Sequence, residues 1–123
     1  MRKITILLVL SLSCATNSNF TEEYNSRLST NFCYALQAVM QCHDLSIRLD
    51  TEGVIQNLLG PKFRSDINAP YAEDCMLGFK KAIDEINSGV CQTAWEKFGC
   101  YGSEESGLIQ QSPLLKNPIL CRY

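Results

Sequence analysis

Hydrophobic residues recur at spacings of three and four along most of this chain, which is the period of a helix that buries one face. The clearest case covers residues 69–87, with Lys80, Lys81, Asp84 and Glu85 on its polar side. Its apolar side carries Cys75, Phe79, Ala82, Ile83 and Ile86. Strand-like alternation is scarce. The pattern therefore predicts an all-α domain, a small disulfide-stapled bundle of five or six short helices.

Four further segments show weaker helical patterns, and turn-forming residues separate them. The expected helices cover 21–28, 30–45, 50–59 and 90–98. A glycine and a proline at 60–61 end the third of these, because glycine accepts the left-handed cap and proline cannot continue a helix. Pro70 suits the first turn of the helix over 69–87. The tail, 103–123, is expected to be extended apart from one turn.

The first fifteen residues have the build of a secretory signal peptide. Arg2 and Lys3 precede the apolar run 4–10, and Ser13 and Ala15 supply the small residues of a cleavage site. The apolar run is too short to span a bilayer. A lipoprotein site is the competing interpretation, although such sites carry a leucine where Ser11 stands. We expect a secreted, extracellular chain with signal peptide 1–15, a single domain over 16–123, and no membrane span.

The cysteine count supports the same compartment. The chain has seven cysteines, of which Cys14 leaves with the leader. An even number in a short secreted chain predicts three disulfides, with fifteen possible pairings. The six that remain are Cys33, Cys42, Cys75, Cys91, Cys100 and Cys121.

The spacing of these cysteines excludes two pairings. Cys33 and Cys42 are nine residues apart, and so are Cys91 and Cys100. Nine residues of helix place the two side chains on opposite sides, about 13 Å apart along the axis. Bonded cysteines need Cα atoms within about 7 Å of each other. Each of these segments is therefore expected to be bridged to two different parts of the molecule.

Charge and residue inventory exclude several classes of function. The formal net charge is −2 and becomes more negative without Arg2 and Lys3, and no basic stripe is present for nucleic acid. His43 is the only histidine, so we expect no metal and no other cofactor. No nucleophile motif surrounds a serine, and we expect no enzyme activity. Asn19 begins an N-glycosylation sequon near the expected mature N-terminus.

The segment from Cys75 to Tyr101, with its Cys-x8-Cys spacing from Cys91 to Cys100, resembles the C-terminal half of insect odorant-binding proteins and their salivary relatives. Cys33 and Cys121 have no clear counterparts in that family's pattern. The resemblance implies a six-helix fold closed by three disulfides around an apolar pocket. It also implies a secreted soluble carrier for a small hydrophobic molecule.

Helical bundles place ligand sites between apolar faces, which makes such a pocket plausible on physical grounds as well. Tyr71, Tyr101 and the Trp95 indole are candidates for the polar contacts that orient a ligand. The candidate lining residues are Leu36, Met40, Leu58, Phe63, Phe79, Ile83, Trp95 and Phe98.

The alternative hypothesis is a secreted, cysteine-rich interaction module that binds a protein partner. The two hypotheses differ in what they expect of the tail, which carries Leu114, Leu115, Ile119 and Leu120. A carrier buries these side chains over a cavity. An interaction module instead has an exposed apolar patch or a fully packed interior.

Overall fold

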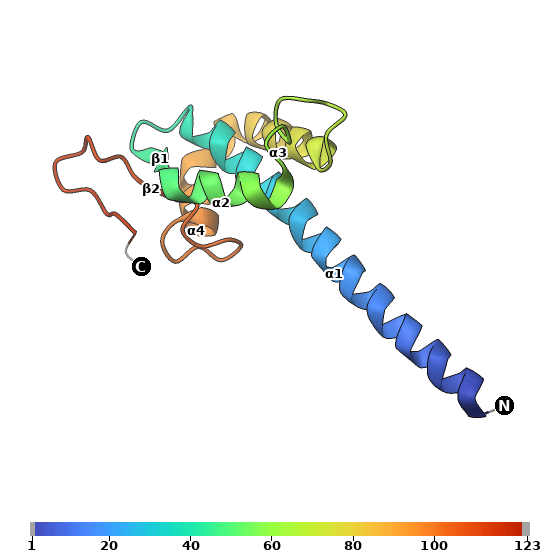
Figure 1. Cartoon of the computed structure of the whole chain (residues 1–123). Helices are drawn as coiled ribbons and strands as arrows, with labels where there is room; N and C mark the ends of the chain where they lie inside the picture. Colours follow the sequence, from blue (N-terminus) through green and yellow to red (C-terminus); the bar gives the residue numbers. More distant parts are fainter. Residues whose placement is uncertain (1, 122–123) are drawn as a thin grey trace.

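The computed structural model describes the backbone of residues 2–121 and the side chains of residues 20–121 (Figure 1). This part holds four α-helices, a short 3₁₀ helix and one two-stranded sheet. The prediction of a mostly helical domain with three disulfides is confirmed. The prediction of five or six helices and no strands is wrong.

Helix α1 (Arg2–Val39) is continuous where the sequence predicted two helices, over 21–28 and 30–45. The two hydroxyls near the expected break do not cap a helix. Ser29 Oγ donates to the carbonyl of Tyr71 at 2.8 Å, and Thr30 Oγ1 donates to the carbonyl of Ser26 at 3.2 Å. Because both hydroxyls find partners without ending the helix, α1 runs through this point.

The N-terminal end of α1 projects away from the rest of the molecule (Figure 1). Residues 2–15 of the predicted leader form its first turns, while Met1 and the side chains of residues 2–19 lie outside the described part. The predicted glycosylation site at Asn19 is among them. Among the described side chains of α1, the first buried one is Asn25.

Helix α2 (Leu49–Leu59) matches the helix predicted over 50–59. Arg48 takes the N-cap position without a side-chain cap, and its guanidinium pairs with Asp50 at 2.6 Å. Thr51 Oγ1 donates to the carbonyl of Gly107 at 3.3 Å. At the other end Gly60, with φ of 94°, stops the helix as predicted.

The helix predicted over 69–87 is shorter and is divided. Helix α3 (Ala72–Asp84) begins after Tyr71, whose left-handed φ of 63° keeps the preceding Pro70 out of the helix. The 3₁₀ helix η1 (Ile86–Ser88) follows it and ends at a left-handed glycine. Helix α4 (Val90–Phe98) then has the predicted bounds.

The two-stranded sheet joins the segment that follows α1 to the C-terminal tail. Strand β1 (Leu45–Ile47) pairs antiparallel with β2 (Ile109–Gln111), and Ile47 lies opposite Ile109. Strands of three residues are too short to show the alternating pattern from which a strand is predicted. Burial of Ile109, whose exposed fraction is 0%, holds the pair against the core.

Aromatic side chains fill the centre of the domain. Phe32 of α1 packs against Phe63 with ring centroids 5.9 Å apart, and Tyr34 packs against Phe98 at 5.6 Å. Phe63 comes from the connection between α2 and α3, so this loop contributes to the core as a helix would. The space between the elements is therefore occupied by side chains.

The three disulfides tie successive segments to one another. One joins α1 to α3, the second joins the turn after α1 to the first turn of α4, and the third ties the tail to the end of α4. Neither nine-residue pair bonds to itself, which confirms the prediction from spacing. The bridges are Cys33–Cys75, Cys42–Cys91 and Cys100–Cys121.

Helices α1 and α3 run parallel and form the closest contact in the fold, which we call the α1–α3 seam. Ser26 donates to Asp74 at 2.7 Å at one end, and Tyr34 donates to Glu85 at the other. Between them lies Gly78, where an added Cβ atom would stand 2.1 Å from the carbonyl oxygen of Thr30. Only a glycine permits this approach of the two backbones.

Candidate functional site

The eight predicted pocket residues fall into three groups. Phe63 and Phe98 belong to the core, with exposed fractions of 1% and 2%. The half-buried residues are Leu36, Phe79 and Trp95, which pack against the core from outside. The exposed residues are Met40, Leu58 and Ile83.

These eight side chains do not surround one cavity in the described part of the chain. Phe63, Trp95 and Phe98 each line a different depression, and none of the other five lines any of these three depressions. The polar candidates are also dispersed, since Tyr101 is 99% exposed and the Tyr71 hydroxyl accepts from the Asn25 amide at 3.4 Å. Ligand binding by these residues stays a prediction.

An apolar stripe instead lies along α3 beside its buried face. The buried face of this helix is made by small residues, Ala72, Cys75, Gly78 and Ala82. Beside it, Met76, Phe79 and Ile83 follow one another at spacings of three and four, which places them on one side of the helix. We call these three residues the α3 stripe.

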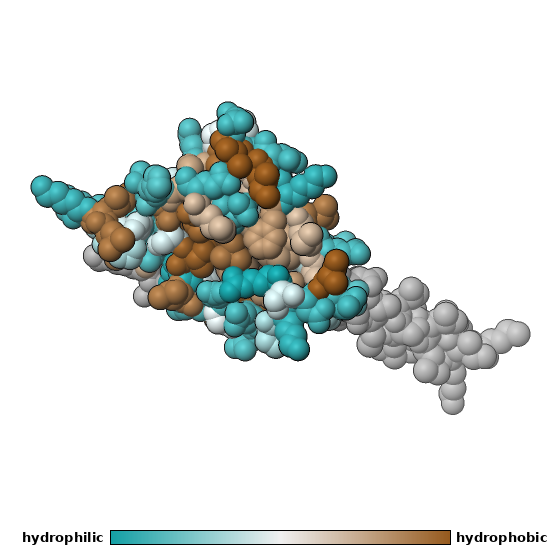
Figure 2. All heavy atoms as spheres, turned by 90° about the horizontal axis from the view of Figure 1, so that it is seen from above, coloured by the Kyte–Doolittle hydropathy of each residue, from teal (hydrophilic) through white to brown (hydrophobic). Residues whose placement is uncertain are grey.

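The α3 stripe is accessible to a partner. Met76 and Ile83 are 59% and 50% exposed, and Phe79 is half-buried. Figure 2 views the side of the molecule on which α3 lies, and apolar side chains gather near the middle of this face with polar ones around them. The sequence did place Phe79 and Ile83 on one apolar side, but it did not separate the stripe from the buried face. The spacing from Met76 to Ile83 was the signal that could have found it.

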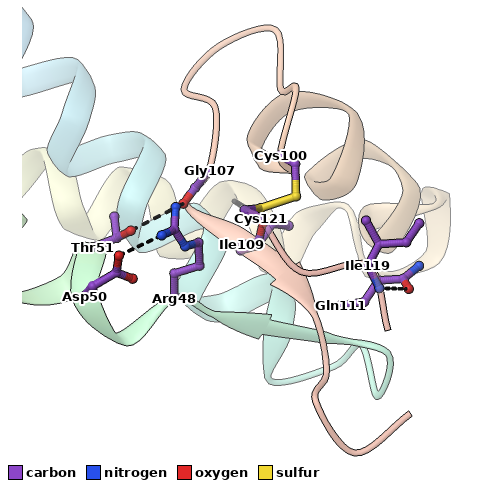
Figure 3. Close-up of a disulfide and its surroundings, with 9 residues drawn as sticks. All are labelled: Arg48, Asp50, Thr51, Cys100, Gly107, Ile109, Gln111, Ile119 and Cys121. Carbon is purple, nitrogen blue, oxygen red and sulfur yellow. Dashed lines mark hydrogen bonds and ion pairs between the residues drawn. A yellow bond between two sulfur atoms is a disulfide. The ribbon is translucent and has the colours of Figure 1, made fainter. Parts of the chain in front are cut away.

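Apolar side chains of the tail face solvent. Leu114 is 95% exposed, and Ile119 and Leu120 are about half exposed. The tail returns to β2 through two hydrogen bonds, from the Gln111 backbone N–H to the Ile119 carbonyl at 3.1 Å and from the Ile119 N–H to Gln111 Oε1 at 2.8 Å. Figure 3 shows the second of these bonds beside the Cys100–Cys121 bridge. The tail is thus fastened at its ends.

A depression of about 450 Å³ lies over the Cys42–Cys91 bridge, where the end of α1, the start of α4 and β2 meet. Trp95 forms part of its wall. Its polar lining consists of Gln41, His43, Asp44, Gln92 and Gln111.

Two groups with perturbed proton affinity lie along the seam and near the loop after α4. Burial, together with the hydrogen bond that its phenol donates to Glu85, raises the pKa of Tyr34 well above its ordinary value. Burial also raises the pKa of Glu105, and the positive charge of Arg27 opposes part of that shift. In both cases the shift favours the protonated form relative to the same side chain in water.

Within residues 20–121, no three side chains of the metal-ligating types lie close enough to hold a metal ion. Among the described helices, none is long and apolar enough to cross a membrane. The chain matches no protein-family model, no curated protein and no solved structure. The resemblance to odorant-binding proteins therefore stays a prediction.

Proposed function

We propose that this protein is a secreted, non-enzymatic helical module that binds a protein partner through the α3 stripe. The observation that carries the proposal is the arrangement of Met76, Phe79 and Ile83 beside the buried face of α3, with Met76 and Ile83 exposed and Phe79 half-buried between them. Contiguous exposed apolar side chains on a small protein mark interaction surfaces, because leaving them in water is unfavourable.

The stripe is best suited to a helical partner. Apolar residues at spacings of three and four are the contacts that two packed helices use. Lys80 and Asp84 stand beside the stripe on the same helix, so its border carries both signs of charge. We infer that the partner offers an amphipathic helix, held mainly by its apolar face rather than by a charge of one sign.

Secretion is supported by the disulfides and by the position of the leader. Three disulfides are typical of proteins that fold in an oxidising compartment. Removal of residues 1–15 leaves the core intact, because the buried side chains of α1 begin at Asn25. The mature domain would then begin with a shortened α1.

Two observations favour the interaction module over the carrier. The interior is filled by the aromatic pairs of Phe32 with Phe63 and of Tyr34 with Phe98. The apolar tail residues, Leu114 above all, face solvent instead of closing a pocket. A carrier requires an enclosed apolar space for its ligand.

A pair of neighbouring substitutions tests the proposal. Met76 and Leu77 have the same exposed fraction, 59%, on the same helix, but Leu77 lies about 100° away from the stripe. The wild-type domain, M76E and L77E are immobilised and exposed to extracellular fluid from the source tissue. We expect a protein that binds to the wild type and to L77E but not to M76E. Equal binding to both variants contradicts the use of the stripe.

Two further measurements test the alternatives to a protein partner, which are a bound small molecule and a second copy of this chain. Native mass spectrometry of the mature protein, beside its denatured mass, detects a retained small molecule, and such a molecule would favour the carrier. Sedimentation of wild type and M76E detects a dimer formed through the stripe, in which case the occupant is a second copy. Neither a retained hydrophobic ligand nor a dimer is expected.

A further inference from the structure

The depression over the Cys42–Cys91 bridge has the size and the polar lining of a small-molecule site. Its volume of about 450 Å³ falls within the range of about 300–1,000 Å³ that is usual for ligand sites. No residue of the α3 stripe lines it. A ligand bound in this depression is therefore independent of the proposed protein partner.

Amide groups dominate the polar lining, and they retain hydrogen-bonding capacity. The side chains of Gln41, His43 and Asp44 make no hydrogen bond to another described residue. Gln92 Nε2 donates to Glu96 at 3.0 Å, and the amide oxygen of Gln92 can still accept a hydrogen bond from a ligand. Gln111 Oε1 accepts from the Ile119 N–H, and the side-chain N–H groups of Gln111 can still donate to a ligand. Donors and acceptors are therefore both present, as each amide supplies both.

Trp95 provides a fixed aromatic wall. A Cβ atom added to Gly99 would stand 3.0 Å from Cδ2 and Cε3 of the indole, so the backbone of Gly99 packs closely against the ring. The ring is half-buried and packs against the core. An indole held in this way combines an apolar face with an N–H donor.

The charge of the lining narrows the ligand class. Asp44 is its only acidic side chain and no lysine or arginine lines the depression, so a phosphate or sulfate would meet no fixed cation. A fatty acid or terpenoid would strip water from the amides without replacing their hydrogen bonds, which is unfavourable for each group. A ligand rich in hydroxyl groups, with an apolar ring face, satisfies both the amides and the indole.

We propose that this depression binds a short neutral saccharide. Its ring packs on Trp95 while its hydroxyl groups exchange hydrogen bonds with Gln41, Gln92 and Gln111. The carboxylate of Asp44 accepts a further hydroxyl. Binding is non-covalent, and the disulfide beneath the site stays intact.

The single tryptophan of the chain makes the test direct. Full-length protein processed by a eukaryotic secretory host is titrated with glucose, galactose, mannose, cellobiose, lactose and chitobiose, up to tens of millimolar. Tryptophan fluorescence and amide NMR shifts are recorded together. We expect at least one sugar to give saturable changes confined to residues 41–45, 91–95 and 111. The absence of any saturable change overturns the proposal.

Paired glutamine variants locate the site. Gln41 and Gln37 are both partly exposed near the end of α1, but only Gln41 lines the depression. We expect Q41A to weaken binding about fivefold to tenfold, consistent with one lost hydrogen bond, and Q37A to leave it unchanged. Because Trp95 contributes to the core, W95A is a secondary variant whose fold is checked by NMR. Undiminished binding by Q41A overturns the proposed site.

A third arm separates the two sources of the sugar. A glycoprotein that bears the preferred sugar is compared before and after enzymatic removal of its glycans. Binding that is lost on deglycosylation identifies a protein-linked glycan as a ligand, whereas binding of the free sugar alone identifies a soluble saccharide. If binding survives both deglycosylation and Q41A, the contact is not to sugar and the proposal is overturned.

Discussion

The α1–α3 seam and the C-terminal tail are each closed by one disulfide, but the two regions are built differently. In the seam, Cys33 and Cys75 are 0% and 1% exposed, and Gly78 allows direct contact between backbones. In the tail, Leu114 is almost fully exposed and Cys121 only partly buried. The Cys33–Cys75 bridge joins two helices that are already packed together, whereas the Cys100–Cys121 bridge holds a tail that has little packing of its own.

Chain entropy alone does not explain this difference. The seam bridge joins residues 42 apart and the tail bridge residues 21 apart. A doubling of loop length changes the closure free energy by only about 0.6 kcal/mol. Both bridges therefore restrict the unfolded chain to a similar extent, and their consequences must differ through the native state. A small domain with a limited core can use both kinds of bridge.

Removing each of the two disulfides in turn should give the largest difference in the free energy of unfolding. We expect C33A/C75A to lower the free energy of unfolding by about 4 kcal/mol or more, because it loses the cross-link and leaves a void between packed helices. We expect C100A/C121A to lower it by less than the roughly 3 kcal/mol of its loop, since the freed tail also gains entropy in the native state. Urea unfolding measures both values.

Hydrogen exchange gives the local counterpart of this experiment. In C100A/C121A, the amides of residues 112–121 should exchange rapidly while those of α1 and α3 keep their protection. In C33A/C75A, protection should fall throughout the domain. Equal global losses for the two variants, with a protected tail, would mean that the tail is packed as firmly as the seam.

Gly78 offers the next largest effect. G78A should cost about 3 kcal/mol, because its Cβ would overlap the carbonyl oxygen of Thr30 and force the two helices apart. The matched control is G53A inside α2, where the added carbon would meet no atom within 4 Å beyond its chain neighbours and its own helix backbone. It should gain about 0.5–1 kcal/mol from helix propensity. Thermal unfolding compares the two, and similar melting temperatures would contradict the close contact.

The sequence predicted the parts of this fold that local signals control. Helix α4 and the end of α2 at Gly60 follow from apolar spacing and from turn residues, and both were placed correctly. The exclusion of the Cys33–Cys42 and Cys91–Cys100 bridges needed only helix geometry. These features depend on neighbours within a few residues.

Features set by distant partners were missed. Whether Ser29 ends a helix depends on the carbonyl of Tyr71, 42 residues away. Periodicity also cannot tell which of two adjacent apolar stripes on α3 is buried. The stripe with Gly78 and Ala82 is buried because small residues let α1 approach, and the bulkier α3 stripe is left outside. Candidate lining residues chosen for size, such as Ile83, therefore fell on the surface.

The hydrogen bond from Tyr34 to Glu85, at one end of the α1–α3 seam, should make the smallest contribution to stability, and that contribution should depend on pH. Tyr34 donates a hydrogen bond to the Glu85 carboxylate from a buried position, and its pKa lies above that of an unfolded tyrosine. The folded state therefore holds this proton more tightly. The resulting stability is fully present below about pH 10 and is lost as the pH rises toward the folded pKa.

Tyr34→Phe should therefore lower the free energy of unfolding by about 2 kcal/mol at neutral pH, because a hydrogen bond to a charged acceptor is lost. It should also make the alkaline decline less steep. Some decline remains, since burial and Glu105 raise the pKa of Tyr24 as well. Tyr101→Phe, at a fully exposed position, is the control and should change neither quantity. Urea unfolding from pH 7 to 11 measures both effects. If Tyr34→Phe and Tyr101→Phe show the same stability at every pH, Tyr34 does not contribute to the packed seam, and the difference between the seam and the tail is smaller than we infer.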